Sequence, residues 1–252
     1  MKRIELENGD HLLWEYTPWD EAVFLKKTAQ LVDFKCQSED SGRKLLAQFE
    51  SDSGAEFVYG RFISSDFAIK KIFFDLDYFV AETSLQVYLS GLQNYELSGM
   101  YKKRLQTLSY ISNDRLDDVA TIAHEMFNFS RFHEDPHITN EKANLRIKSW
   151  VLDMKNQDVK TLISKDADDN IRGFMIYEIE NHKTAKLVLG GCIASERASA
   201  PFFWATVIDE LKNAGFSKIR TTISAANSGV LSLYLNLGFG ISVTHSDYHK
   251  HL

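Results

Sequence analysis

The chain has 252 residues and a net charge of −6, with 35 acidic and 29 basic residues interspersed, so no basic stripe marks a nucleic-acid partner. No apolar run approaches the roughly 20 residues that a membrane span needs, and the charged start MKRIELENGD is unlike a signal peptide. The two cysteines, Cys36 and Cys192, and eight histidines without paired ligand spacing predict no disulfide framework and no metal site. We therefore expect a cytoplasmic globular protein.

The first hundred residues are rich in short strand-like and aromatic segments. Three segments are predicted as short strands or edges (VDFKCQSED, KLLAQFE and EFVYGRFIS), and TSLQVYLSGL is predicted as another strand. Polarity rises between Asn94 and Lys103, which we interpret as a domain boundary. The predicted domains are therefore residues 1–100 and 101–252.

The second part alternates helical and strand patterns in a clearer order. Helices are predicted from about Asn113 to Asn128 and from Thr139 onward, with apolar residues at helical spacing. The elements predicted after them are strands at 159–164 and 171–180 joined by the turn DADDN, a strand at 185–194, a helix at 199–214, a strand at 218–224, a helix at 228–237, and a strand pair or one long strand at 239–249. This order predicts an α/β fold with a mixed sheet and helices on both faces.

The most informative motif is the segment NSGVLSLYLNLGF, which runs from Asn227 to Phe239. Its tyrosine, Tyr234, follows Asn227 by two helical turns, so both lie on one face of the predicted helix. The segment resembles the N-x-x-A-x-x-L-Y-x-K-x-G-F segment of the GCN5-related N-acetyltransferases, the GNAT superfamily, with Gly229 for the small residue and Asn236 for the usual lysine. The resemblance implies the GNAT fold and acyl-CoA as co-substrate.

In that family the asparagine contacts the coenzyme and the tyrosine protonates the departing thiolate, which implies these roles for Asn227 and Tyr234. A tyrosine suits the chemistry because its ordinary pKa of about 10 keeps it protonated, while the pKa of the thiol it protonates is near ~8.5. The thioester would lie between the strand at Gly190–Ile193 and the strand at Lys218–Ser224. Direct attack by an amine needs no covalent enzyme intermediate, so Cys192 is interpreted as a packed residue rather than a nucleophile.

The GNAT resemblance also implies a pyrophosphate cradle at the start of the preceding helix, where the family has R/Q-x-x-G-x-G/A. Backbone N–H groups at a helix N-terminus bind such anions. Here Arg197 takes the arginine role, the glycine positions are changed to other residues, and Pro201 has no N–H. The residues implied to contact the coenzyme are Gly191, Cys192, Ile193, Arg197, Ala198, Ser199, Ala200, Phe202, Asn227 and Tyr234.

Two further segments, SRFHEDPHITNEKANLRIKSWV and DDNIRGFMIYEI, resemble the sugar-nucleotide N-acyltransferases typified by dTDP-fucosamine acetyltransferase. The resemblance implies that the acceptor is a dTDP-linked amino-6-deoxysugar used for surface polysaccharide such as O-antigen or capsule. It also suggests a homodimer. It implies a truncated GNAT-like N-terminal domain before a complete one.

The acceptor site is predicted at SRFHEDPH. Arg131 suits a diphosphate oxygen, and Phe129 or Phe132 suits stacking on the base. His133 is a candidate to accept the proton of the amine, since the ordinary pKa of histidine is near ~6.5. Glu178 on the central strand is the other candidate base.

An internal repeat is predicted with an offset of 161 residues. The pattern Asp66–x6–Phe73–x3–Asp77–Tyr78 overlays Asn227–x6–Tyr234–x3–Gly238–Phe239. Phe73 stands where the second copy has Tyr234, so the first copy is expected to lack the acid.

Two alternatives remain from the sequence. One is a GNAT acting on another small amine, such as a polyamine. The other is a non-catalytic GNAT-like binding module, which the changed glycines of the cradle would favour. The acyl group (acetyl or 3-hydroxybutyryl) and the position of the amine (C3 or C4) stay open.

Overall fold

The computed structural model describes all 252 residues, and the chain divides into two compact units. Unit 1 comprises Met1–Ser84, Phe129–Arg146 and Val243–Leu252, and unit 2 comprises Leu85–Asn128 and Ile147–Ser242. The division falls within three elements, β5 (Phe79–Ser90), α6 (Asn140–Asp153) and β11 (Gly240–His251), which therefore contribute residues to both units. The continuous domains 1–100 and 101–252 refer instead to two copies of one fold, and that division stays a prediction.

Unit 1 contains a sheet in the strand order β1-β2-β3-β4-β11. Its other elements are β1 (Lys2–Glu5), β2 (His11–Tyr16), α1 (Pro18–Phe24), β3 (Thr28–Lys35), α2 (Glu39–Ser53), β4 (Phe57–Ile63) and α3 (Phe67–Asp75). β3 and β4 are parallel, and β11 is antiparallel to β4. One face packs on α2 and α3 through residues such as Phe49 and Phe73, and the other packs on α1 and residues 129–146 through Phe24 and Phe132.

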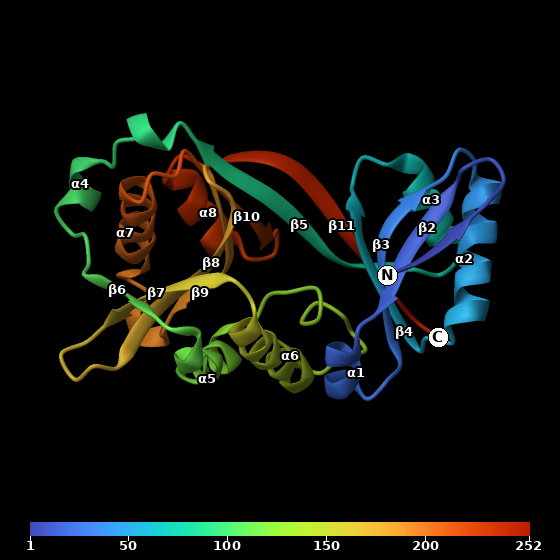
Figure 1. Cartoon of the computed structure of the whole chain (residues 1–252), viewed down its shortest axis with the longest axis horizontal. Coiled ribbons are helices and arrows are strands. Elements are labelled where there is room, and N and C mark those ends of the chain that lie inside the picture. Colours follow the sequence, from blue (N-terminus) through green and yellow to red (C-terminus); the bar gives the residue numbers. More distant parts are fainter. The chain divides into compact units, whose positions relative to one another are not determined.

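The prediction of a strand at KLLAQFE is wrong, because this segment lies in the middle of α2 (Figure 1). Ser38 begins the helix with a capping box, in which its side chain and that of Ser41 each accept from the other's backbone N–H. The apolar residues Leu45, Leu46 and Phe49 are fully buried on one face. Spacings of one, three and four fit a helix as well as a short strand, and the cap decides between them.

Unit 2 contains a mixed sheet in the strand order β5-β10-β9-β8-β7-β6. Its elements are α4 (Gly99–Lys102), β6 (Leu108–Ile111), α5 (Leu116–Met126), β7 (Val159–Lys165), β8 (Ile171–Asn181), β9 (Thr184–Cys192), α7 (Ala200–Asn213), β10 (Lys218–Ser224) and α8 (Ser228–Asn236), with short 3-10 turns at 92–94, 113–115, 154–156 and 194–196. The predicted hairpin at DADDN joins β7 to β8, and the predicted final segment is one long strand, β11.

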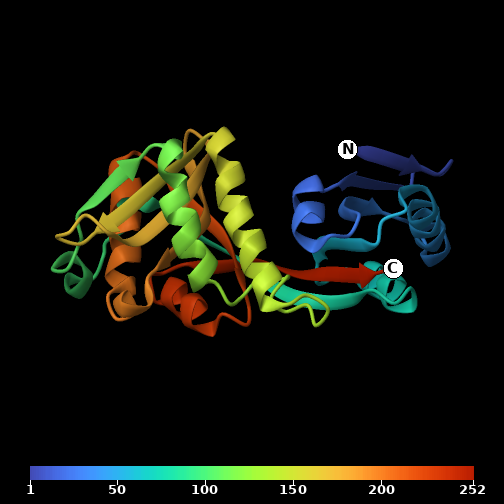
Figure 2. The same cartoon turned by 90° about the horizontal axis from the view of Figure 1, so that it is seen from below.

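The two faces of the unit 2 sheet carry two separate apolar clusters. α7 and α8 cover one face, where Phe203, Ile208 and Tyr234 are buried against the strands. α5 and the second half of α6 cover the other face, and Figure 2 shows these two helices side by side. The α/β fold with helices on both faces is therefore confirmed.

The predicted offset of 161 residues recurs in the bounds of the elements. It relates β4 (57–63) to β10 (218–224), α3 (67–75) to α8 (228–236), and β5 (79–90) to β11 (240–251), at both ends in each case. It also relates the positive φ of Gly54 to that of Gly215, and that of Asp77 to that of Gly238. The two halves of the chain therefore fold with the same succession of elements.

The last strand of each repeat pairs within the other unit. In unit 1 the strand next to β4 is β11, which follows α8 in the chain. In unit 2 the strand next to β10 is β5, which follows α3. None of the helices is both long enough and apolar enough to cross a bilayer.

Candidate functional site

The strands β9 and β10 of unit 2 are parallel neighbours that pair over only three residues each. The pairs run from Thr184–Lys218 to Lys186–Arg220. Beyond them β9 continues to Cys192, still paired with β8, while β10 continues to Ser224. The register of β9 against β8 shifts between Leu187 and Leu189, which marks a bulge. The edge of β9 that faces β10 is therefore free beyond the bulge, so an extended ligand can pair with its backbone.

Two glycines on this free edge allow side chains to approach the backbone closely. A Cβ added to Gly191 would lie 2.5 Å from the methyl carbon of Met126, and one added to Gly190 would lie 2.4 Å from that of Met175. The neighbouring Cys192 is partly buried, and burial raises the pKa of its thiol to about 12. The thiol is therefore protonated at neutral pH, which supports its interpretation as a packed residue.

The start of α7 follows β9 after one 3-10 turn, with Arg197 and Ala198 exposed at the corner. The N–H groups of Ser199 and Phe202 donate to the carbonyls of Glu196 and Ser199, at 3.0 and 2.9 Å. The Ser199 hydroxyl lies 2.6 Å from a Glu196 carboxylate oxygen. This leaves the amides of Ala198 and Ala200 to hold a pyrophosphate, fewer than a glycine-rich cradle offers.

α8 brings Asn227 and Tyr234 to one end and one face of the same helix. The Asn227 side chain caps the helix by accepting from the Val230 N–H at 3.2 Å. Tyr234 is 4% exposed, and its ring lies 4.8 Å from that of Phe239. Burial raises the pKa of the Tyr234 hydroxyl above its ordinary value, against smaller opposing effects of Trp204 and Thr221, so this hydroxyl is protonated at neutral pH.

Searches with the sequence found no matching family model and no matching curated protein. Solved structures, by contrast, match nearly the whole chain. A GCN5-related N-acetyltransferase from Sphaerobacter thermophilus is 12% identical and has a TM-score of 0.67 over 98% of this chain and 78% of its own. A conserved protein of unknown function from Staphylococcus epidermidis is 9% identical, with a TM-score of 0.64 over 99% of this chain and 94% of its own. A tandem GNAT protein of the clavulanic acid biosynthesis pathway is 11% identical, with a TM-score of 0.57 over 88% and 74%.

This chain has the GNAT fold. The free edge of β9, the start of α7 and the N-terminus of α8 all belong to unit 2. The residues that the sequence implied for the coenzyme, from Gly191 to Tyr234, are therefore gathered around one pair of strands. No group of three or more His, Cys, Asp or Glu side chains is placed to hold a metal ion.

The residues predicted for the acceptor, from Phe129 to His133, belong to unit 1 of the GNAT-fold chain. Phe132 is 5% exposed and packs against Phe24 and Tyr59, at 5.1 and 5.6 Å between ring centroids. Phe129 is 43% exposed. Both ring nitrogens of His133 are engaged, with the Ser130 hydroxyl at 2.8 Å and the Asn144 carbonyl oxygen at 2.7 Å, so His133 has no free nitrogen for an amine proton in this arrangement.

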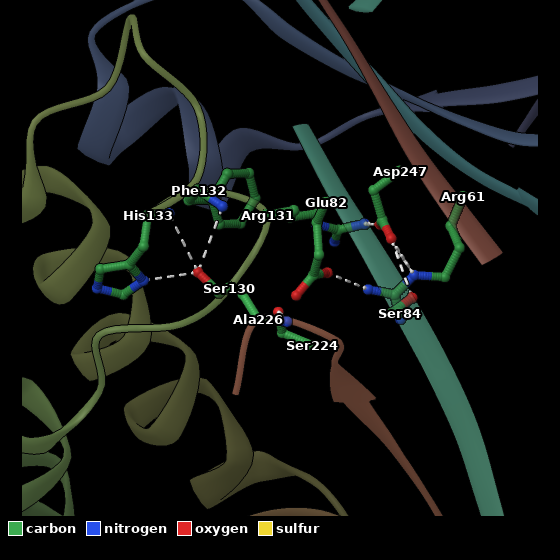
Figure 3. A network of polar contacts seen from close by, with 10 residues as sticks. All are labelled: Arg61, Glu82, Ser84, Ser130, Arg131, Phe132, His133, Ser224, Ala226 and Asp247. Atoms are coloured by element: carbon green, nitrogen blue, oxygen red, sulfur yellow. Dashed lines mark hydrogen bonds and ion pairs between the residues drawn. The ribbon is translucent and has the colours of Figure 1, made fainter. Parts of the chain in front are cut away.

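Arg131 belongs to a buried ionic network in unit 1 that Figure 3 shows. Asp247 is fully buried and receives three donors, the Nε of Arg61 at 2.8 Å, the Nη1 of Arg131 at 3.4 Å and the Ser84 hydroxyl at 3.1 Å. The Nη2 of Arg61 also reaches Glu82 at 3.1 Å. Burial, with a smaller effect of Asp247, raises the pKa of Glu82 to about 7. Two carboxylates thus share two guanidinium groups.

Sequence reasoning did not single out Glu82, Asp247 or Arg61. Glu82 follows one apolar strand segment and Asp247 stands among polar residues, so neither has a local signal of burial. What brings them together is the pairing of Asp247 with Arg61 in the β11–β4 ladder, across 186 residues of sequence.

The second predicted base, Glu178, lies on β8 opposite Lys186, and its carboxylate pairs with the ammonium of that lysine at 2.8 Å. Gly191 is five residues farther along β9 than Lys186, about 16 Å at the rise of a strand. Glu178 and the free edge of β9 are thus at opposite ends of the ladder.

Proposed function

We propose that this chain is an acyl-CoA-dependent N-acyltransferase whose catalytic copy is unit 2. The observation that carries the proposal is the free backbone edge of β9 beyond its three pairs with β10. An extended pantetheine arm can add to this edge, as a peptide adds to a sheet. The pyrophosphate would then lie at the start of α7, near Arg197 and the free amides.

In the proposed reaction the acceptor amine attacks the thioester carbon, the carbon–sulfur bond breaks and the thiolate leaves. Tyr234 donates its proton to that thiolate, and the amine loses a proton to a base. Burial favours the protonated form of Tyr234, so the donor is loaded before the reaction begins. His133 and Glu178 stay the proposed bases, but the pairing of Glu178 with Lys186 leads us to expect little loss of activity in Glu178→Gln.

We infer that the acceptor is a dTDP-linked amino-6-deoxysugar. The support is the likeness of SRFHEDPH and DDNIRGFMIYEI to the sugar-nucleotide N-acyltransferases. The product would serve surface-polysaccharide synthesis, and the donor would be acetyl-CoA or 3-hydroxybutyryl-CoA.

Thiol release measures this activity directly. Each of the two donors is paired with dTDP-linked 3-amino and 4-amino-6-deoxysugars, and Tyr234→Phe is compared with wild type. Loss of the general acid should lower kcat by about 10² or more. Tyr177→Phe is the matched control, because Tyr177 is buried in the same apolar cluster but its hydroxyl bonds to Tyr110 at 3.0 Å. Release that survives Tyr234→Phe would remove the proposed acid and keep the enzyme.

A non-catalytic binding module is the second candidate, and one observation favours it. The Glu196 carboxylate lies on the Ser199 hydroxyl at the start of α7, where a pyrophosphate would need positive charge. A module that has lost the cradle should show no rise in melting temperature with acetyl-CoA, whereas an enzyme should be stabilised in proportion to the ligand concentration.

A further inference from the structure

Unit 2 has a cavity on the solvent-facing side of its sheet, away from α7 and α8. Its volume is about 420 Å³, within the range of small-molecule sites. Its lining residues come from β5, β10 and β11, and they are Gln86, Tyr88, Lys218, Arg220, Ile241 and Ser242. Alternate residues of β5 and β10, such as Val87 and Ile219, are buried in the cluster under α7 and α8. The lining side chains therefore point to the opposite face of the sheet.

The internal repeat shows what this face of the sheet looks like when it is covered. The offset of 161 residues places Phe57 at the position of Lys218, Tyr59 at that of Arg220, and His249 at that of Tyr88. In unit 1 these three residues are at most 1% exposed, because Phe24 and Phe132 pack on them. In unit 2 the aromatic pair is replaced by two cations, and the face is open. Two cations on an open face do not form a core, but they suit an anionic ligand.

The charges of the cavity are not balanced by the protein. Arg220 is held by Glu180, with 2.7 Å between Nε and a carboxylate oxygen. Lys218 has no carboxylate within ion-pair distance, and its ammonium lies 5.5 Å from the centre of the Tyr88 ring. The ring itself lies against the backbone of Gly240, where an added Cβ would be 3.5 Å away. One unpaired cation and one aromatic face thus lie side by side.

We propose that this cavity binds the nucleoside diphosphate part of the acceptor, an inference that rests on the proposed function. Lys218 and the free Nη1 of Arg220 contact the phosphates, and the base stacks on Tyr88. Gln86 and Ser242, which bond to each other at 3.1 Å, face the same ligand. Arg220 lies four residues before Ser224, about 13 Å along β10. A diphosphate-linked sugar would lead from the cavity along β10 toward the free end of β9.

Calorimetric titration of the full chain with dTDP tests the proposal. Lys218→Ala should weaken dTDP binding roughly tenfold, because a charge-assisted contact to phosphate is lost. Tyr88→Leu should weaken dTDP binding and leave the binding of inorganic pyrophosphate unchanged. Lys160→Ala is the matched control, since Lys160 is a half-exposed lysine on β7 of the same unit. Affinity for dTDP that is equal in wild type, Lys218→Ala and Tyr88→Leu would overturn the proposal, as would displacement of dTDP by coenzyme A.

The acyl-transfer assay separates this inference from the proposed function. In the supporting result, Lys218→Ala raises KM for the sugar nucleotide about tenfold with kcat unchanged. Thiol release with an unchanged KM in Lys218→Ala would keep the enzyme and overturn the cavity assignment. Binding of dTDP that depends on Lys218, without thiol release from any donor and acceptor, would support the cavity and sink the acyltransferase.

Discussion

Glu82 gives the sharpest test of the buried network in unit 1. Its side chain is 4% exposed, and burial together with Asp247 raises its pKa from 4.5 to about 7, against the opposing effect of Arg61. A carboxyl group with a raised folded-state pKa contributes stability that is fully present below its unfolded pKa and is lost as the pH rises through the folded pKa. At about 1.4 kcal/mol per pKa unit, the whole shift corresponds to roughly 3 kcal/mol.

Glu82→Gln keeps the shape of the side chain and removes its titration. Most of the loss falls between pH 5 and pH 8, so the free energy of unfolding of wild type should drop by roughly 2 to 3 kcal/mol relative to Glu82→Gln over this range. Urea unfolding followed by circular dichroism at both pH values measures the difference. Other titrating groups cancel between the two proteins, and Glu7→Gln on the exposed surface is the control. A difference that is the same at pH 5 and pH 8 would refute the reasoning.

Two further predictions concern unit 2. Asn227→Ala removes the side-chain acceptor of the Val230 N–H and should lower the free energy of unfolding by about 1 kcal/mol, measured by urea unfolding, while Asn227→Ser should restore most of it. Gly191→Ala places a methyl group 2.5 Å from the end of the Met126 side chain, so it should lower the melting temperature, and Met126→Ala in the same chain should reverse that loss. A melting temperature that the double variant leaves low would show that the backbone of Gly191, rather than Met126, sets the limit.

The second half of the chain could be predicted element by element because its ends are marked locally. Gly215 and Gly238 stop α7 and α8 with positive φ values of 91° and 82°, and Asn227 caps α8. The turn residues of DADDN fix the hairpin between β7 and β8. The repeat was also visible, because the positions that cap and end a helix recur with it.

The first half and the ionic network could not be predicted in the same way. The segment KLLAQFE has a pattern that fits either period, and only its capping box selects the helix. Arg61 and Asp247 pair across a ladder between strands that are far apart in the chain. Their partners are set by which strands pair, and no local pattern carries that information.

The exchange of last strands has a consequence for synthesis on the ribosome. When β4 has left the ribosome, its neighbour β11 has not yet been made, because β11 ends at His251. The edge of β4 then exposes unpaired N–H and C=O groups, which is the kind of edge that pairs with other nascent chains. Completion of unit 1 therefore waits for the end of translation, and chains truncated before residue 243 should be prone to aggregate.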